Sequence, residues 1–270
     1  MSDRPGAGLF SVLLRHWRTR RGLSQLDLAL AADVSSRHVS FLETGRARPS
    51  REMVLHLGAS LSVPLRDQNV MLGAAGFRAE FEEPGPDVAF PPAVEQAVAR
   101  MMRQQEPFPL VVMNRLYDVL RSNEGGQRMI ARMVAEPAAL AAEPANAYRL
   151  LFDPRLCRPF IVDWERTARL AVSRLHREAL EQPTDEGLAA LSRSLFEYPG
   201  VPQAWRQPDV STPSEPTLTL RLRRGDLELS FLTTLTVFNA PQSVALEDLR
   251  LESYFPLDDA TERACRELAQ

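Results

Sequence analysis

The sequence contains little cysteine and no long apolar segment. Its two cysteines, Cys157 and Cys265, lie far apart and outside any CxxC or Cys/His cluster. This spacing indicates neither a zinc site nor a disulfide framework, so we expect two reduced thiols. No segment approaches the roughly 20 apolar residues of a membrane span, and residues 1–8 lack the basic and apolar regions of a signal peptide. We therefore expect a soluble, cytoplasmic protein without a membrane partner.

Signatures of catalysis are missing as well. The sequence has no P-loop, no GxGxxG and no GxSxG motif. Its four histidines are scattered, with neither the spacing of a metal pair nor a nucleophile motif beside them. We therefore predict no catalytic residue, no metal site and no cofactor.

Charge is unevenly distributed along the chain. The net charge is −3, and lysine is absent, so every basic side chain apart from histidine is an arginine. Residues 1–51 contain nine arginines against four acidic residues, a net charge of about +5, which leaves about −8 for the remainder. A basic head on an acidic body indicates that the head contacts a polyanion and the body does not.

The length and composition predict two domains. A chain of 270 residues exceeds the roughly 100–200 residues of a usual single domain. Residues 78–92 are rich in proline, glycine and acidic side chains and separate two regions of regular apolar periodicity. We therefore predict an N-terminal domain at residues 1–77, a linker at 78–92 and a C-terminal domain at 93–270.

The N-terminal segment shows five short helical patterns with very short connections. Apolar residues at helical spacing mark the first helix, which Gly22 ends. Ser24, Ser35 and Ser50 stand where the N-caps of the next three helices are expected, and Pro64 precedes the fifth. We therefore predict an all-α domain of five helices, with a turn at residues 32–33.

The C-terminal segment combines helical and strand-like patterns. Helical spacing extends from Ile161 to Leu175 and from Leu188 to Leu195. Strand-like runs cover residues 109–113, 116–120, 218–222, 227–237 and 249–255. Alternation of apolar and polar residues gives a strand one buried and one solvated face. We therefore predict an α+β domain whose five-stranded antiparallel sheet is covered by helices on one side.

The third predicted helix, residues 35–44, divides its side chains between two faces. At about 100° per residue, Val39 and Leu42 fall together on one side. The opposite arc carries Ser36, Arg37, Ser40 and Phe41. A helix in the major groove of DNA needs donors, acceptors and apolar contacts of this kind to read base edges. The alternative is an ordinary solvated face with Phe41 in the core, and this helix alone does not decide between them.

Three segments around this helix share a recognisable pattern. They are Ser24–Ala29, Asp33–Arg37 and Phe41–Ser50. Over residues 9 to about 76 the chain resembles the phage-repressor-like helix-turn-helix family often called XRE. The resemblance implies binding to double-stranded DNA, a phosphate contact by Gln25 and an ion pair between Arg18 and Glu43.

The pattern and the resemblance together define an expected contact set for DNA. It comprises Ser24, Gln25, Ser35, Ser36, Arg37, Ser40, Phe41, Arg46 and Arg48. Asp33 departs from the glycine that is common in the family's turn, although aspartate tolerates left-handed backbone. Leu26 and Leu30 replace polar residues of the family, and this extra apolar surface could serve dimer contact or pack against the body.

The C-terminal segment carries a second set of motifs. They are Asn114–Asn123, Leu151–Pro154, Asp163–Glu165, Trp205, Thr233–Asn239 and Tyr254–Glu262. Over most of residues 93–268 the chain resembles the MmyB-like ligand-binding domain, a family that follows an XRE head directly. The resemblance implies a PAS-like α+β fold whose cavity accepts an apolar, lipid-like small molecule.

A pocket is expected between the sheet and the helical middle of this domain. Its expected lining is Leu229, Phe231 and Leu235 from the sheet, with Met129, Met133, Phe152 and Trp164 from the helices. Asn123 or Arg158 would meet a polar head group at the mouth. Methionine adapts to irregular apolar partners, which favours a cavity, whereas composition alone also allows a solid core.

The sequence thus predicts a sequence-specific transcription regulator. We expect a homodimer on a palindromic operator, because two-fold protein symmetry matches head-to-head half-sites, and an apolar or fatty-acid-like ligand for the body. One alternative makes the body a dimerisation module without a ligand. A less favoured one is an enzyme that the head targets to DNA, for which no catalytic set can be assembled from the sequence.

Overall fold

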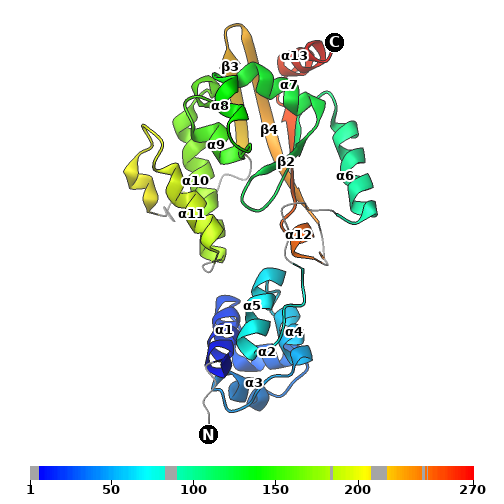
Figure 1. Cartoon of the computed structure of the whole chain (residues 1–270), viewed down its shortest axis with the longest axis vertical. Helices are drawn as coiled ribbons and strands as arrows, with labels where there is room; N and C mark the ends of the chain where they lie inside the picture. The colour runs from blue at the N-terminus through cyan, green and yellow to red at the C-terminus, as the bar shows by residue number, and fades with distance from the viewer. Residues whose placement is uncertain (1–5, 83–89, 183–184, 208–217, 239–240, 242) are drawn as a thin grey trace. The chain divides into compact units, whose positions relative to one another are not determined.

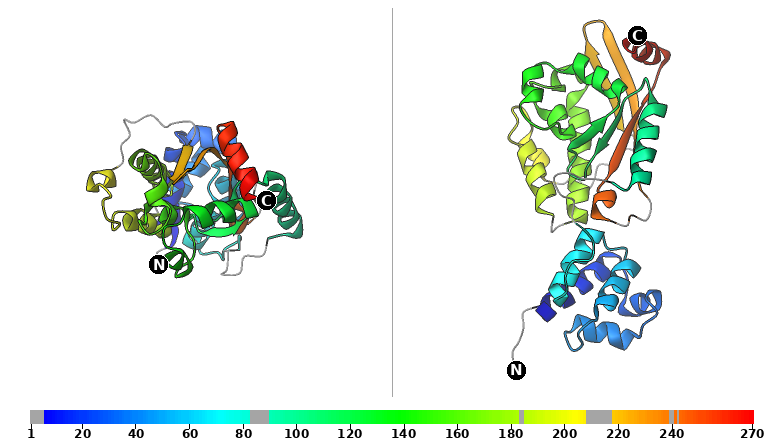
Figure 2. Two further views of the ribbon diagram at one scale, coloured as in Figure 1. Left: turned by 90° about the horizontal axis from the view of Figure 1, so that it is seen from above. Right: turned by 45° about the vertical axis from the view of Figure 1, so that its right-hand side comes forward.

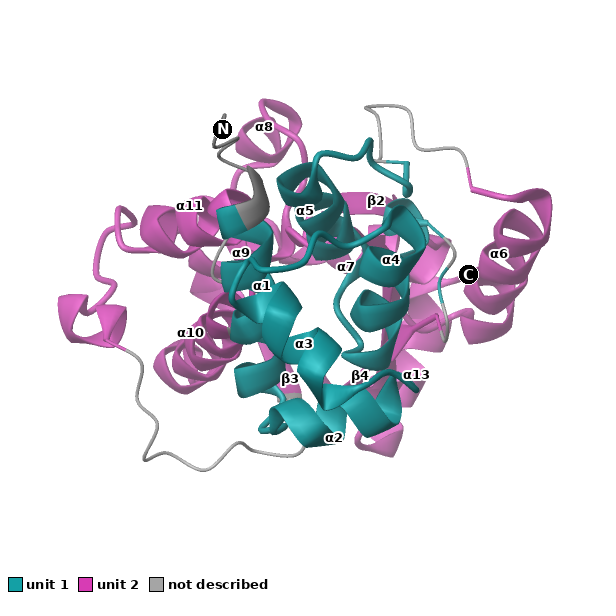
Figure 3. Ribbon diagram, turned by 90° about the horizontal axis from the view of Figure 1, so that it is seen from below, with its two compact units in different colours: residues 1–89, 239–247 teal, residues 90–238, 248–270 magenta. Residues whose placement is uncertain are grey.

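The chain folds into two compact units (Figure 3). The structure is a computed structural model that describes residues 6–82, 90–182, 185–207, 218–238, 241 and 243–270. Unit 1 comprises Met1–Ala89 and Asn239–Glu247, and unit 2 comprises Phe90–Phe238 and Asp248–Gln270. Residues 83–89 of the predicted linker, and Asn239, lie outside the described residues.

Unit 1 is helical, as the sequence predicts. Its helices are α1 (Gly6–Arg20), α2 (Gln25–Ala31), α3 (Ser36–Glu43), α4 (Arg51–Ser60), α5 (Leu65–Ala75) and the short α12 (Val244–Glu247) (Figure 1). Each of the first five contributes a fully buried leucine to one core: Leu14, Leu28, Leu42, Leu57 and Leu72. α12 comes from a distant part of the chain, and Glu247 accepts a hydrogen bond from the backbone N–H of Leu65 at 2.9 Å.

Serine side chains begin three helices of unit 1. The Oγ atoms of Ser24, Ser35 and Ser50 accept from the backbone N–H three residues further on, at 3.1–3.2 Å. In α2 the Asp27 carboxylate reciprocates by accepting from the Ser24 N–H at 2.8 Å, which completes a capping box. Such a cap stabilises a helix by about 1 kcal/mol. The three predicted caps are therefore confirmed.

Unit 2 is built on a five-stranded antiparallel sheet. Its strands are β1 (Leu110–Met113), β2 (Val119–Ser122), β3 (Leu218–Arg224), β4 (Leu227–Val237) and β5 (Arg250–Pro256), in the order β2-β1-β5-β4-β3. In register, Leu222 pairs with Leu229, and Glu252 pairs with Leu235. The predicted α+β class with its five strands is thus confirmed.

Helices lie on both sides of this sheet. α7 (Glu124–Met133), α9 (Ala147–Phe152) and α10 (Trp164–Glu181) cover the face that carries Leu222, Leu229 and Phe231. The opposite face buries Val112 and Leu251, and α6 (Pro92–Gln105) lies on that side (Figures 1 and 2). α13 (Asp259–Leu268) packs beside β4, where the Thr261 hydroxyl accepts from the backbone N–H of Ser230 at 2.9 Å. The prediction of cover on one side was therefore too narrow. The remaining helices are α8 (Pro137–Ala141), η1 (Arg158–Phe160), α11 (Glu186–Leu195) and η2 (Gln203–Arg206).

Two predicted boundaries in unit 2 differ from the structure. The sequence predicts helix from Ile161, but Ile161 forms an isolated β-bridge with Leu222, and α10 begins three residues later. The sequence also predicts strand at 116–120, but β2 begins at Val119. The Asn114 side chain accepts from two backbone N–H groups of the intervening loop, and Tyr117 has a φ of 65°, so these residues form a tight loop.

Candidate functional site

Helices α2 and α3 form a helix-turn-helix. Asp33, in the turn between them, has a φ of 47°, which lies in the left-handed region. The backbone N–H of Val34 donates to the carbonyl of Ala29 at 2.9 Å and closes the turn. Aspartate is one of the few residues besides glycine that adopt this conformation readily. The turn therefore forms without a glycine.

Helix α3 leaves one of its faces accessible. Ser36 and Arg37 are exposed, and Ser40 and Phe41 are half-buried. Val39 and Leu42, on the other face, are fully buried. The Arg37 guanidinium lies over the Phe41 ring, 5.1 Å from its centre, so the two side chains pack together at the surface of α3. A cation, two hydroxyls and an aromatic edge are thereby presented together.

The other residues of the expected DNA contact set surround this face in sequence. Ser24 and Ser35 are exposed caps of α2 and α3, and Arg46 and Arg48 are exposed in the loop that follows α3. Together with α3 they would present hydroxyl and guanidinium donors, which are the groups that contact phosphates and bases in complexes with DNA.

A buried carboxylate links α1, α2 and α3. Glu43 is only 4% exposed and accepts from Arg18 through two bonds, at 2.6 and 3.0 Å. The side-chain amide of Gln25 donates to the same carboxylate at 2.8 Å. Burial alone would raise the pKa of Glu43, but these bonds outweigh it and hold the pKa below its usual value. Arg18 and Glu43 are thus paired within the helix packing, and the expected phosphate contact of Gln25 would have to coexist with an intramolecular bond.

Unit 2 contains a cavity between the sheet and helices α7, α9 and α10. Its volume is about 130 Å³. Most of its wall is apolar and includes Met129, Ile130, Met133, Leu151, Leu220 and Leu222. The described part of unit 2 therefore has a hollow space beside its core, in the region where the sequence predicts a pocket.

One part of the cavity wall is polar. It comprises Tyr117, Arg174, Thr233, Glu252 and Tyr254. The two parts lie at different positions along β4. Leu222, of the apolar part, pairs with Leu229, whereas Glu252, of the polar part, pairs with Leu235, six residues further along the strand. The cavity is thus amphipathic.

The residues expected to line the pocket have three different positions. Met129 and Met133 line the cavity. Phe152, Leu229 and Phe231 are fully buried in the clusters beside it and do not line it. Trp164 is half-buried between the same clusters, and Leu235 is 38% exposed. Alternation identified the correct face of β4. It did not identify which residues of that face line the cavity, because this depends on which helix covers each part of the strand.

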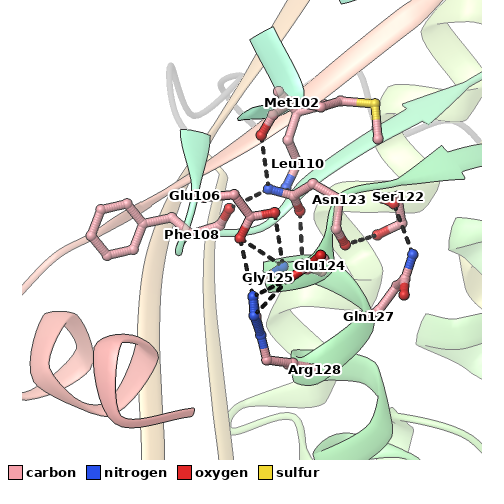
Figure 4. A network of polar contacts seen from close by, with 11 residues as sticks. Met102, Glu106, Phe108, Leu110, Ser122, Asn123, Glu124, Gly125, Gln127 and Arg128 are labelled. Carbon is pink, nitrogen blue, oxygen red and sulfur yellow. Dashed lines mark hydrogen bonds and ion pairs between the residues drawn. The ribbon is translucent and has the colours of Figure 1, made fainter. Parts of the chain in front are cut away.

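Asn123 does not line the cavity, so the expectation that it meets a ligand head group is wrong. It caps α7: Oδ1 accepts from the backbone N–H groups of Gly126 at 2.9 Å and Leu110 at 2.8 Å (Figure 4). Nδ2 donates to the carbonyls of Phe108 at 2.9 Å and Met102 at 3.3 Å. All of its hydrogen-bonding capacity is therefore used inside the protein.

The network around this cap also contains two ion pairs, both made by Arg128. Glu106 accepts from the Gly125 backbone N–H at 3.1 Å and from Arg128 at 3.4 Å, and Glu124 also accepts from Arg128 (Figure 4). Carboxylates are favourable at the first turn of a helix because the N-terminal N–H groups carry partial positive charge. The network therefore fixes the start of α7, the helix that supplies Met129 and Met133.

Arg158 likewise has a structural position. Its guanidinium stacks on the ring of Trp164, 3.6 Å from the centre. It donates to the carbonyls of Phe152 at 3.1 Å and Pro199 at 2.6 Å. Arg158 lines a separate surface hollow with Trp164 and Pro199, and not the amphipathic cavity.

The polar cavity residues Arg174 and Glu252 were not identified from the sequence. A usable signal exists for Arg174, because it follows Thr167 and Ala171 at helical spacing and all three line the cavity. Glu252 and Tyr254 are two residues apart in β5, so both side chains lie on the same face of the sheet, the face that lines the cavity. A charged residue on the buried face of a helix, together with one on the buried face of a strand, is therefore the pattern that could have indicated a polar site.

Other kinds of site find no support among the described residues. No group of three or more His, Cys, Asp or Glu side chains there could hold a metal ion. Cys157 and Cys265 are buried free thiols, and burial raises the pKa of Cys157 to about 12. None of the described helices combines the length and the apolar character of a membrane span.

Two families match the chain. The family described as MmyB-like transcription regulator ligand binding domain matches residues 94–268, and a helix-turn-helix domain family matches residues 9–67. No curated protein matches the chain. Among solved structures, "Structure of an RNA-binding Light-Oxygen-Voltage Receptor" is similar with 14% sequence identity and a TM-score of 0.28, over 94% of this chain and 63% of that one. The chain thus spans less than two thirds of the length of that structure.

Proposed function

The chain belongs to the family of transcription regulators with an MmyB-like ligand-binding domain, and we propose that its cavity senses an apolar, lipid-like small molecule. The helix-turn-helix of unit 1 makes it a DNA-binding regulator. The observation that carries the proposal is the cavity of about 130 Å³ between the sheet and α7, α9 and α10. Ligand sites are typically concave and mostly apolar, with a few polar groups that fix orientation.

Two features of unit 1 support specific binding to a DNA operator. The exposed face of α3 combines Arg37 with Ser36, Ser40 and Phe41, and an arginine can bind guanine through two hydrogen bonds. Its neighbours Ser24, Ser35, Arg46 and Arg48 would hold phosphates. We further propose that two copies of the chain bind a palindromic operator as a homodimer.

The sensing function is tested by thermal unfolding of the full chain with a panel of fatty acids and neutral apolar compounds. A ligand that binds only the native state raises the melting temperature in proportion to the logarithm of its concentration once it exceeds Kd. Ala171→Leu, which fills the cavity, should abolish the shift. Ala179→Leu, the same change on α10 outside the cavity lining, should keep it.

The absence of a shift with every compound would contradict the sensing function. Unit 2 would then be a dimerisation module, and the alternative predicted from the sequence would replace the proposal. The oligomeric state of the full chain, measured by sedimentation with and without operator DNA, is the corresponding readout.

A further inference from the structure

Arg174 carries hydrogen-bond donors that no described residue uses. It shares one face of α10 with Thr167 and Ala171, and all three line the cavity. Its Nε donates to Glu178 at 3.2 Å, whereas Nη1 and Nη2 have no hydrogen-bond partner in the described part of the chain. A guanidinium presents its donors as a planar fork that matches the two oxygens of a carboxylate. Arg174 is therefore suited to bind an anion that enters the cavity.

The charges around Arg174 leave one positive charge to be balanced. Glu178 accepts from Arg174, from Arg250 at 2.9 Å and from the hydroxyl of Tyr117 at 2.6 Å. Two guanidinium groups thus share one carboxylate. A buried charge is costly unless it is paired, so a ligand with one negative charge would compensate this cluster if Glu252 were neutral.

Glu252 is a second ionisable residue in the polar part of the cavity wall. The Tyr254 hydroxyl donates to it at 3.2 Å, and no ion-pair partner lies within 4 Å of it among the described residues. The ionisable groups near it are Arg174 and Glu178 from α10, Arg250 and Tyr254 from β5, Tyr117 from the loop before β2 and Tyr148 from α9. Burial raises the pKa of Glu252, and the charge of Arg174 together with hydrogen bonds from Tyr254 and Thr233 opposes this only in part. A neutral carboxyl group has an O–H that can donate to a bound carboxylate.

The size of the cavity limits the apolar part of the ligand. Its volume of about 130 Å³ is close to the ~150 Å³ of an engineered apolar cavity that binds benzene. The cavity therefore accommodates an apolar body of about six carbon atoms, against Met129, Met133 and Leu222.

This inference rests on the proposed function of the cavity as a ligand site. We infer that the ligand is a small monocarboxylic acid whose carboxylate is held by Arg174 and by the neutral form of Glu252, with its apolar body between α7 and the sheet. When Glu252 is ionised beforehand, binding of the carboxylate takes up one proton from solution, which neutralises Glu252. No bond other than this O–H bond is formed or broken.

The test compares three probes of equal length on the full chain: hexanoate, hexanol and hexylamine. Isothermal titration calorimetry between pH 6 and pH 9 should show the tightest binding for hexanoate at pH 6. Its Kd should rise with pH, by up to tenfold per unit above the pKa of Glu252, because one proton is bound together with the ligand. The Kd of hexanol should change less.

Two variants separate the roles of the residues. Glu252→Gln keeps a donor and cannot ionise, so hexanoate should still bind and its Kd should no longer depend on pH. Arg174→Gln should weaken hexanoate roughly 10- to 100-fold, the usual effect of losing a hydrogen bond to a charged group. Its hexanol affinity should stay unchanged, which shows that the cavity remains intact.

The possible failures are distinguishable. If hexanol binds but hexanoate does not, or if hexylamine binds more tightly than hexanoate, the acid-binding inference is wrong and the sensing function stands. A hexanoate Kd that is constant from pH 6 to pH 9 in the unmodified chain would overturn the role of Glu252. If no probe binds, the cavity is not a ligand site, and the proposed function fails with the inference.

Discussion

The arginines of unit 1 differ in what their side chains can contact. Arg18 is 14% exposed and has its guanidinium committed to Glu43 and to the carbonyl of Leu23. Arg37 is exposed, and its guanidinium stacks on the ring of Phe41. Stacking restricts the rotamers of Arg37 without consuming its hydrogen-bond donors, and a partly ordered donor loses less entropy when it binds. Arg37 is therefore the better candidate to contact a base.

Replacement of Arg37 and of Gln25 should have different effects on DNA binding. Arg37→Ala should lose about 1–3 kcal/mol on the preferred operator and relax the preference at one base pair. Gln25→Ala should weaken binding to all sequences, because a phosphate contact carries no sequence information. Selection of binding sites from random DNA by each variant is the measurement. An unchanged consensus for Arg37→Ala would assign base reading to another residue.

The Glu43 network should control the stability of unit 1 and its response to acid. Removal of one member of a buried ion pair leaves the other unpaired, so Glu43→Ala should cost about 3 kcal/mol. The pKa of Glu43 is lower in the folded than in the unfolded chain, so its contribution is present above about pH 4.5 and lost as the pH falls through the folded-state value. Hydrogen exchange of α1 in the full chain, measured between pH 3 and pH 7, reports both effects.

Asp27→Ala provides the control for Glu43→Ala. Asp27 is exposed and contributes to a capping box, so its loss should destabilise unit 1 less than the loss of Glu43 does. Equal exchange rates in the two variants would show that the ion pair contributes no more than a surface cap.

Single residues were predictable from the sequence where the chemistry is local. The caps at Ser24, Ser35 and Ser50 depend only on the next three residues, and they were found. Asn123 has the same local signal, since it precedes Glu124 and Gly125 at the start of a helix, but the expectation of a ligand contact hid it. The cavity role of Glu252 depends on the packing of α10 against β5, which no local pattern specifies.

At the level of elements, the cap of α3 connects stability with DNA binding. Ser35 and Ser50 make equivalent caps on α3 and α4, with bonds of 3.1 and 3.2 Å. Either Ser→Ala change should therefore cost about 1 kcal/mol of stability in unit 1. Only α3 presents the expected base contacts, so fraying of its first turn displaces Ser36 and Arg37. Ser35→Ala should then lower operator affinity, whereas Ser50→Ala should leave it nearly unchanged at temperatures well below unfolding.

Operator titrations of these two variants, combined with thermal unfolding, check this prediction. Equal stability losses with unequal DNA affinities support the placement of α3 in the groove. Equal losses of affinity would mean that overall stability, and not the position of α3, determines binding.

Elements were predictable wherever their periodicity is undisturbed. β4 alternates from Leu227 to Val237 and was predicted over its whole length. β2 was placed too early because Tyr117 adopts a positive φ that the side chain of Asn114 stabilises, and a tyrosine gives no signal for that conformation. Cover of the second sheet face by α6 was missed for two reasons. Val112 belongs to a run in which both faces are apolar, and in β5 the charged residues Arg250 and Glu252, not Leu251, lie on the face towards α10 and the cavity.

At the scale of the whole molecule, the chain passes between the two units more than once. Unit 1 includes Asn239–Glu247, which lies in sequence between β4 and β5 of unit 2. These two strands carry Thr233, Glu252 and Tyr254 of the cavity wall. The continuous chain therefore joins cavity strands to α12, whose Glu247 is hydrogen-bonded to the first residue of α5. Such connections offer a physical route by which a ligand could bias the DNA-binding unit.

If the two units are coupled, the effect must be reciprocal. A ligand that changes operator affinity by a given factor must have its own affinity changed by the same factor when the operator is bound. Coupling energies are typically about 1–3 kcal/mol, so we expect a factor of about 5 to 150, of either sign. The measurement is a pair of titrations of the full chain: operator DNA with and without saturating hexanoate, and hexanoate with and without saturating operator. Glu247→Gln, which weakens the acceptor for the Leu65 N–H without touching the cavity, should reduce both factors equally. Hexanoate binding that leaves operator affinity unchanged would show that unit 2 holds its ligand without regulating unit 1.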